Sequence, residues 1–248
     1  MKTAAKIIEK NLLFLMFFYC LFFQISCGLE EVIVVEAPTV TYNDPLYSDD
    51  DYTNYYCSFL TKESGQPDSF LGTEVYYKIY NNSSVLVSER NAITAVNTTS
   101  NGSSAATRMV ETYTYQPLGM NPQNSDSIFL SSSGSDRRVY FRLVDNGDGD
   151  DLVADIRISG TSTGKIPYRY SNDKSFDFFD NDDSDSTGKI DVKPESGDLD
   201  YKHSSTASAS AEYYVQLFAV GVAWDSSSLT RSYSLVLDLG SIPIKDSY

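Results

Sequence analysis

The sequence predicts an all-β fold, a sandwich of short strands, from three observations. After Gly28 the chain consists of short runs of Val, Ile, Tyr, Phe and Leu bounded by Asn, Asp, Ser and Gly, which is the pattern of strands and turns. Aromatic residues make up 13% of the chain, with 19 Tyr, a composition that favours strands and can fill a sizeable core. No segment after Gly28 shows the spacing of an amphipathic helix, apart from one turn at 90–95. Many short strands separated by turn signals indicate a two-sheet sandwich.

The strands follow one another along the whole chain after the N-terminal segment. Residues 97–106 are predicted to be a low-complexity, solvated loop, and residues 171–201 a long Asp-rich loop. The runs 138–145 and 152–159 flank the acidic turn 146–151, so we expect them to pair as a β-hairpin. Strand-like runs lie at residues 37–42, 55–60, 72–80, 85–88, 109–115, 127–131, 138–145, 152–159, 190–192, 212–224 and 232–239.

The run at 72–80 alternates clearly between two faces, as a strand requires. One face carries Val75, Tyr77 and Ile79, and the other carries Glu74, Tyr76, Lys78 and Tyr80. Tyr76 and Tyr80 have two interpretations. Either they form an exposed binding patch, because Tyr supplies contact area at low entropic cost, or they pack on a neighbouring element.

Parts of these strands resemble a fibronectin type III domain. Residues 37–40 (APTV) resemble its opening, residues 70–80 (FLGTEVYYKIY) its central strand, and residues 212–220 (EYYVQLFAV) its penultimate strand. The resemblance implies one fibronectin type III or immunoglobulin-like sandwich over residues 37–248. More residues separate these strands than the type III fold needs, so a large acidic insertion is predicted at about 95–205. The tryptophan expected on an early strand of that fold is absent.

The N-terminus has the features of a secretory signal peptide. Three Lys precede the apolar run 12–23, which is shorter than the roughly 20 residues of a membrane-spanning helix. Cys27 follows the small residue Ser26, and this resembles the lipobox of bacterial lipoproteins, in which the cysteine is acylated and becomes the first residue. A polar residue stands where Leu is usual, which is closer to the lipoboxes of spirochaetes. We predict a lipoprotein signal peptide at 1–26 and a lipidated tether at 27–36.

Two alternatives to lipidation remain open at this stage. The N-terminal run could stay uncleaved as a signal anchor, or conventional cleavage near Ser26 could leave Cys27 free to pair with Cys57 in an oxidising compartment. If Cys27 is acylated, Cys57 is a lone cysteine in a strand-like run, where it would act as a small buried hydrophobe. The lax lipobox, the YYKIY strand and the closing YYVQLFAVGVAW strand together resemble a family of uncharacterised spirochaetal (Treponema-like) lipoproteins.

The charge of the chain limits its partners. The formal net charge is −15, and the predicted signal peptide carries three Lys and one Glu, so the mature chain carries −17. Nucleic acid and anionic lipid both require basic contacts, so neither is expected as a partner. An acidic surface is compatible with solubility, with cations or with basic partners.

The sequence offers little for catalysis. Its single histidine, His203, lies in a polar segment, and no HExxH, CxxC or P-loop motif occurs. We therefore predict no catalytic residue and no enzymatic activity. A hydrolase using paired carboxylates stays open only because an acidic chain always contains candidate pairs.

One acidic segment resembles part of a calcium-binding loop. Oxygen-bearing side chains occur at alternate positions before Gly188, as in such loops, but Pro194 stands where the closing bidentate Glu belongs. We expect a solvated acidic loop, with weak Ca²⁺ binding as the alternative and no other cofactor. The candidate ligands are Asp183, Asp185, Thr187 and Asp191.

These features predict a lipid-anchored protein of the cell envelope, periplasmic or at the outer-membrane surface, held to the membrane through Cys27. Its folded part would be a non-catalytic binding or structural module for a protein or glycan ligand. A calcium-dependent adhesin and an envelope hydrolase are the alternatives.

Overall fold

Strands supply most of the regular structure, and the described helices lie between β2 and β3. The computed structural model describes residues 33–39, 56–100, 102–121, 128–144, 154–169, 174–178, 193–205 and 212–245, all within the unit Ile33–Tyr248. The elements are β1 (Tyr56–Leu60), β2 (Phe70–Tyr80), α2 (Ser83–Thr94), α3 (Ser103–Thr107), the π-helix η1 (Arg108–Thr112), β3 (Gln116–Asn121), β4 (Leu130–Ser131), β5 (Arg138–Arg142), β6 (Asp155–Ile158), β7 (Thr161–Ser162), β8 (Ile166–Arg169), β9 (Tyr201–Lys202), β10 (Glu212–Asp225), β11 (Thr230–Tyr233) and β12 (Leu237–Lys245).

The two longest strands, β2 and β10, form the centre of the larger sheet. They pair antiparallel from Tyr80 opposite Tyr214 to Phe70 opposite Ala223. The other edge of β10 is paired first with β11, along Val222–Asp225, and then with β12, along Glu212–Ala219. The free edge of β2 is taken in turn by β4, β3 and β9, and β8 continues the sheet beyond β3. This eight-stranded sheet confirms the strands predicted at 72–80 and 212–224. The returning strand predicted at 232–239 is instead divided between β11 and β12.

A second, four-stranded sheet packs on one face of the first. Its order is β1-β5-β6-β7, all antiparallel, and Thr39 pairs with Leu60 at its edge. The pairing of β5 with β6 confirms the predicted hairpin strands. Thus the chain is mostly β-structure with two antiparallel sheets, as the sequence predicted. The residues assigned to an insertion contribute strands to both sheets: β5, β6 and β7 to the smaller, and β3, β4, β8 and β9 to the larger.

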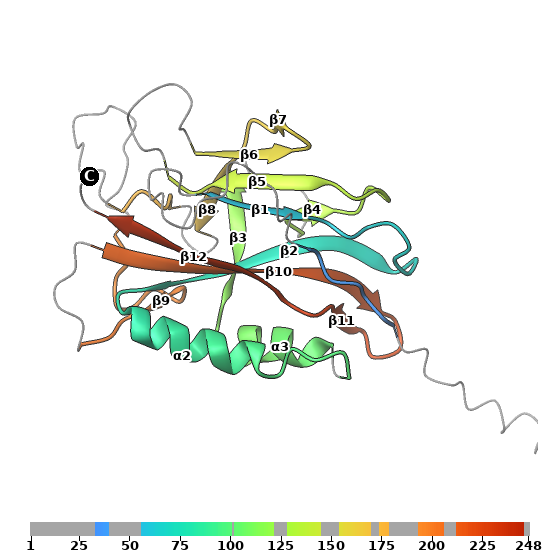
Figure 1. Ribbon diagram of the computed structural model, residues 1–248, viewed down its shortest axis with the longest axis horizontal. Coiled ribbons are helices and arrows are strands. Elements are labelled where there is room, and N and C mark those ends of the chain that lie inside the picture. Colours follow the sequence, from blue (N-terminus) through green and yellow to red (C-terminus); the bar gives the residue numbers. More distant parts are fainter. Residues whose placement is uncertain are drawn as a thin grey trace, which may run out of the picture. The chain divides into compact units, whose positions relative to one another are not determined.

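The sequence predicted only one helical turn, at 90–95, and a strand at 85–88. Both segments belong to helix α2, so the strand prediction is wrong and the helix is longer than predicted. Helices α2, α3 and η1 form a third layer on the face of the larger sheet opposite the smaller sheet (Figure 1). The side chain of Asn82 caps α2 by accepting hydrogen bonds from the backbone N–H groups of Ser84 and Val85. Only Leu86 and Ile93 of this helix are fully buried, so its apolar face is too sparse to show in the sequence.

The segment after α2 also differs from the prediction. Residues 97–106 were expected to be a loop, yet α3 begins at Ser103 and buries Ala105 and Ala106, whose small size brings the helix close to its neighbours. Residues 109–115 were expected to be a strand. Instead η1 follows directly, and the backbone N–H of Tyr113 donates to the carbonyl of Arg108 across a wide π-type turn.

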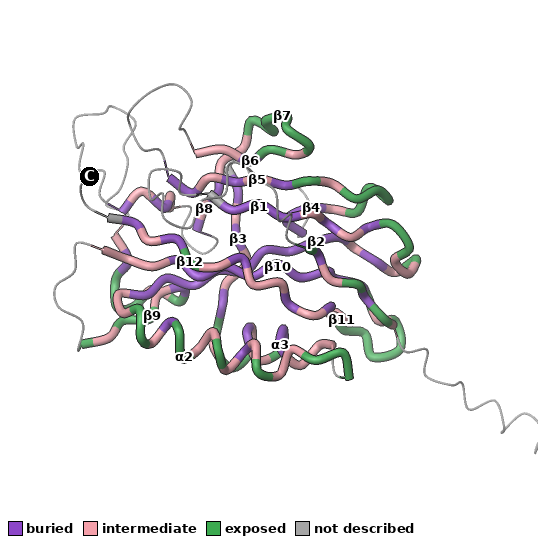
Figure 2. Tube along the Cα trace, in the orientation of Figure 1, coloured by how far each residue is buried: buried purple, intermediate pink, exposed green. Residues whose placement is uncertain are grey.

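The larger sheet is therefore buried on both faces, and Figure 2 shows buried residues along most of β2 and β10. Val75, Tyr77 and Ile79 pack in the core between the two sheets. Tyr76 and Tyr80 pack in the core beneath the helices, so they form no exposed patch, and the packing interpretation holds. Among the described residues, no helix is long and apolar enough to cross a membrane.

Gly72 is predicted to be essential for the free edge of β2. It adopts φ +146, and a Cβ there would lie 2.0 Å from the carbonyl oxygen of Leu130 in β4. We expect Gly72→Ala to lower the free energy of unfolding by about 2–3 kcal/mol, through overpacking and an unfavourable φ. Urea denaturation measures this. Gly197→Ala is the matched control, because nothing lies within 4 Å of the added Cβ. Equal effects of the two substitutions would contradict the close approach of β4.

Candidate functional site

The residues to which the sequence assigned functions lie outside the described residues. Cys27, the predicted lipid attachment site, is one of them. The candidate calcium ligands, Asp183, Asp185, Thr187 and Asp191, are the others. Within the ranges that the structure describes, no three His, Cys, Asp or Glu side chains are grouped so as to hold a metal ion. Both assignments therefore stay predictions.

Cys57 is a free thiol in the core between the sheets. It lies on β1, is almost fully buried, and its Sγ is 3.8 Å from the carbonyl oxygen of Leu239. Burial raises the pKa of this thiol, and the nearby charge of Asp238 raises it further. The predicted role as a small buried hydrophobe agrees with this position.

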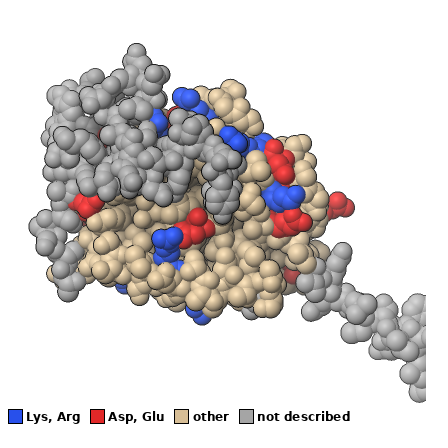
Figure 3. Space-filling view, viewed as in Figure 1, with Lys and Arg blue, Asp and Glu red and all other residues tan. Residues whose placement is uncertain are grey.

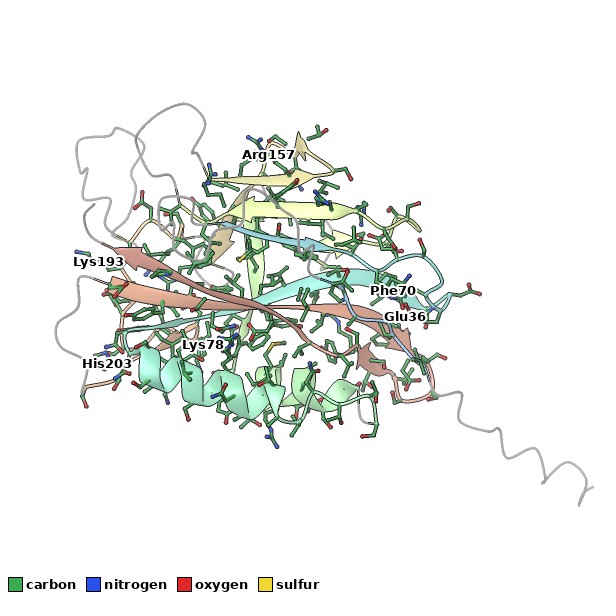
Figure 4. All side chains as sticks on the ribbon, in the orientation of Figure 1. Glu36, Phe70, Lys78, Arg157, Lys193 and His203 are labelled. Atoms are coloured by element: carbon green, nitrogen blue, oxygen red, sulfur yellow. The ribbon has the colours of Figure 1, made fainter. Side chains whose placement is uncertain are left out.

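His203 lies just beyond β9 and is exposed (Figure 4). Its Nδ1 is 3.4 Å from the hydroxyl oxygen of Tyr201 and 3.4 Å from the amide nitrogen of Asn81. The rings of His203 and Tyr201 pack edge to face. These neighbours place His203 at the surface beside the end of β2.

The first described residues are attached firmly to one end of the larger sheet. Ile33 and Val35 pack with Phe70 and Ala223 in a small apolar cluster. The backbone of Glu36 exchanges two hydrogen bonds with the side chain of Gln66, at 3.1 and 2.9 Å. We call the part of the domain formed by residues 33–36, the loop 61–69 and the hairpin 224–230 the tether end; Figure 4 marks it by Glu36 and Phe70.

A glycine makes this attachment possible. A Cβ at Gly221 would lie 2.9 Å from both the carbonyl oxygen of Glu36 and a methyl carbon of Val35. The chain therefore crosses β10 at the one position that has no side chain on this face. Residues 33–36 were predicted to belong to a tether, and the structure places them in contact with the sheet.

A buried ion pair joins the helices to β2. The Nζ of Lys78 lies 3.2 Å from Glu89 of α2, and the two side chains are 6% and 12% exposed. Lys78 also donates to the carbonyl oxygen of Tyr113. Tyr80 donates to Glu89 at 2.8 Å, and its hydroxyl is 3.0 Å from that of Tyr115. Burial lowers the pKa of Lys78, and the charge of Glu89 only partly offsets this effect.

A second buried pair joins β8 to the residues before β9. Arg169 is fully buried and donates to Asp200 at 2.7 and 2.8 Å and to Asp198 at 2.6 Å. Tyr77 of β2 donates to the same Asp200 carboxylate at 2.6 Å. Arg169 belongs to β8, Tyr77 to β2, and the two aspartates to the segment before β9. The cluster therefore holds three segments together at the edge of the larger sheet. The partners lie far apart in the sequence, so no local pattern could reveal them.

Charges at the surface are mixed in sign. At the tether end Lys62 lies 3.7 Å from Glu36 and 4.0 Å from Asp136, and Figure 3 shows basic and acidic side chains next to one another there. Glu63, nearby, is buried. Burial alone would raise its pKa, but hydrogen bonds from Ser133 and Arg137, with one from Thr61, outweigh burial and lower that pKa.

Comparisons with protein-family models, with curated proteins and with solved structures give no match.

The Lys78–Glu89 pair gives a prediction for the helix layer. Lys78→Met leaves the Glu89 carboxylate buried without its cation, so we expect a loss of about 3–5 kcal/mol in unfolding free energy. The double substitution Lys78→Met with Glu89→Gln should cost clearly less than the sum of the two single substitutions. Denaturant unfolding of the four chains measures the coupling.

An ion pair whose cation is half-exposed supplies the control for this cycle. Arg157, which is half-exposed, lies 2.7 Å from Asp155, and its replacement by Ala should change stability by less than about 1 kcal/mol. Strictly additive effects of Lys78→Met and Glu89→Gln would show that the buried pair does not join the layers.

Proposed function

We propose that this chain is a lipid-anchored protein of the cell envelope, attached to the membrane through an acylated Cys27 after removal of residues 1–26. A charged start, the apolar run 12–23 and the small residue before Cys27 support this proposal. The acyl chains on the lipidated cysteine would hold the protein stably, because two or more chains are needed for lasting attachment.

The observation that carries the proposal is the distance from Cys27 to the folded domain. Among the described residues, the apolar contacts of the domain begin at Ile33, six positions after Cys27 in the sequence. Six fully extended residues span about 20 Å at most. Cys57 is a free thiol buried in the core, and this supports an acylated Cys27 over a Cys27 that pairs with Cys57.

We infer that the two sheets form the core of a fibronectin type III or immunoglobulin-like sandwich. In such folds the first, second and fifth strands share one sheet, and the third, sixth and seventh share the other. Thr39, β1 and β5 have that arrangement in the smaller sheet, and β2, β10 and the returning strands β11 and β12 have it in the larger. The chain departs from the pattern in its helices after β2 and in the strands β6–β9 after β5.

The domain itself is proposed to act as a non-catalytic binding or structural module of the envelope, with a protein or glycan as its ligand. The buried ion pairs at Lys78 and Arg169 each connect separate elements, which supports a structural role for them. The net charge of the mature chain, −17, disfavours nucleic acid as the ligand.

Acylation of Cys27 is tested by metabolic labelling with a palmitate analogue in a bacterium that processes lipoproteins. We expect label on the wild-type chain, none on Cys27→Ala, and movement of that variant out of the membrane fraction. Cys57→Ala is the matched control, because it removes the other cysteine of the mature chain and should retain full label. Absence of label from the wild type, or equal label on Cys27→Ala, would contradict the proposal.

A further inference from the structure

Exposed apolar side chains gather at the tether end. Among the described residues, five large hydrophobic side chains are exposed: Val34, Val87, Leu199, Trp224 and Leu229. Three of them, Val34, Trp224 and Leu229, belong to the tether end. The backbone N–H of Trp224 donates to the carbonyl of Ser69, and Gln66 of the same loop is hydrogen-bonded to Glu36, so the segments that carry these side chains lie together. Figure 1 shows the segment 33–39 running beside the end of β10 and β11.

The hairpin between β10 and β11 presents two of these side chains. Trp224, the only tryptophan of the chain, is 42% exposed near the end of β10. Leu229 is 71% exposed in the turn, at φ +56, where a Gly, Asn or Asp would be less strained. Asp225 already stabilises the turn by accepting hydrogen bonds from Ser227 and Ser228. Folding therefore does not explain an exposed leucine at this position.

The proposed anchor brings this surface close to lipid. The chain between Cys27 and the tether end spans at most about 20 Å. Once Cys27 is anchored, the tether end therefore meets the bilayer as part of the same attached molecule, at an effective concentration on the order of millimolar. A few apolar side chains suffice for contact under that condition. Tryptophan is the side chain most suited to the boundary between headgroups and acyl chains, because its ring is apolar and its N–H can stay hydrated.

We infer that the tether end rests on the bilayer, with Trp224 and Leu229, flanked by Val34, inserted among the headgroups; this inference rests on the proposed lipid anchor. The charges around it select the lipid. Glu36, Asp68 and Asp225 outnumber Lys62 in these segments, so the surface suits zwitterionic rather than anionic headgroups. The domain therefore has one orientation relative to the membrane, with the end of β2 at Tyr80 directed away from the bilayer.

The single tryptophan allows a direct test. The chain is produced from its full gene in a lipoprotein-processing bacterium, purified from membranes and reconstituted into phosphatidylcholine vesicles, with or without brominated acyl chains. Acylation of Cys27 is checked by mass spectrometry and vesicle attachment by flotation. We expect brominated lipid to lower Trp224 emission by about half or more, since an indole at the headgroup boundary lies within reach of the bromines. Vesicles rich in phosphatidylglycerol should give weaker quenching.

Two matched variants separate insertion from mere proximity. Leu229→Asp suits the backbone at φ +56, so the variant should fold, and we expect it to lose most of the quenching. Leu199→Asp makes the same change at an equally exposed leucine near β9, which pairs with the opposite end of β2, and should leave quenching unchanged.

The outcomes are distinct. An acylated chain that floats with the vesicles but whose emission is unaffected by bromine overturns this inference and leaves the lipid anchor standing. Equal quenching of Leu229→Asp and Leu199→Asp also overturns it. A chain without an acyl group on Cys27 that fails to float overturns the proposed anchor, and the inference falls with it.

Discussion

The antiparallel pairing of β2 with β10 is the constraint on which the remaining structure depends. It runs over the full length of β2, and both of its faces are covered, by the smaller sheet on one side and by the helices on the other. Because successive residues of a strand point to opposite faces, a slip of one residue would place Tyr76, Lys78 and Tyr80 in the wrong core. The buried contacts of Lys78 with Glu89 and of Tyr77 with Asp200 are possible in this register alone.

Two glycines extend the influence of this pair to its surroundings. Gly72 admits the backbone of β4 to the edge of β2, and Gly221 admits residues 35–36 to the surface of β10. Through Gly221 the path of the N-terminal segment is tied to the central sheet. Few residues therefore separate the proposed lipid from the tether end and the core. This short connection is why the fold limits the orientation of the domain on the membrane.

The sequence was most informative where the signal was local. The runs at 72–80 and 212–224 identified the central strands, and the alternation at 72–80 assigned the faces of β2 correctly. The prediction for Cys27 likewise rests on a contiguous segment of sequence. The helices were missed because Leu86 and Ile93 are the only fully buried residues of α2 and because 97–106 is low in complexity. The Arg169–Asp200 pair and the packing of Val35 against Phe70 and Ala223 depend on contacts between distant segments. Such contacts exist only once the fold brings the residues together.

Native-state hydrogen exchange tests the central role of the β2–β10 pair most directly. The account predicts that amides of β2 from Val75 to Ile79 and of β10 from Val215 to Val220 exchange only through global unfolding, with an opening free energy equal to that from urea denaturation. Amides of α2 and α3, which pack on one face only, should open at lower free energy. Exchange of the β2 and β10 amides through openings less costly than those of the helices would contradict the account.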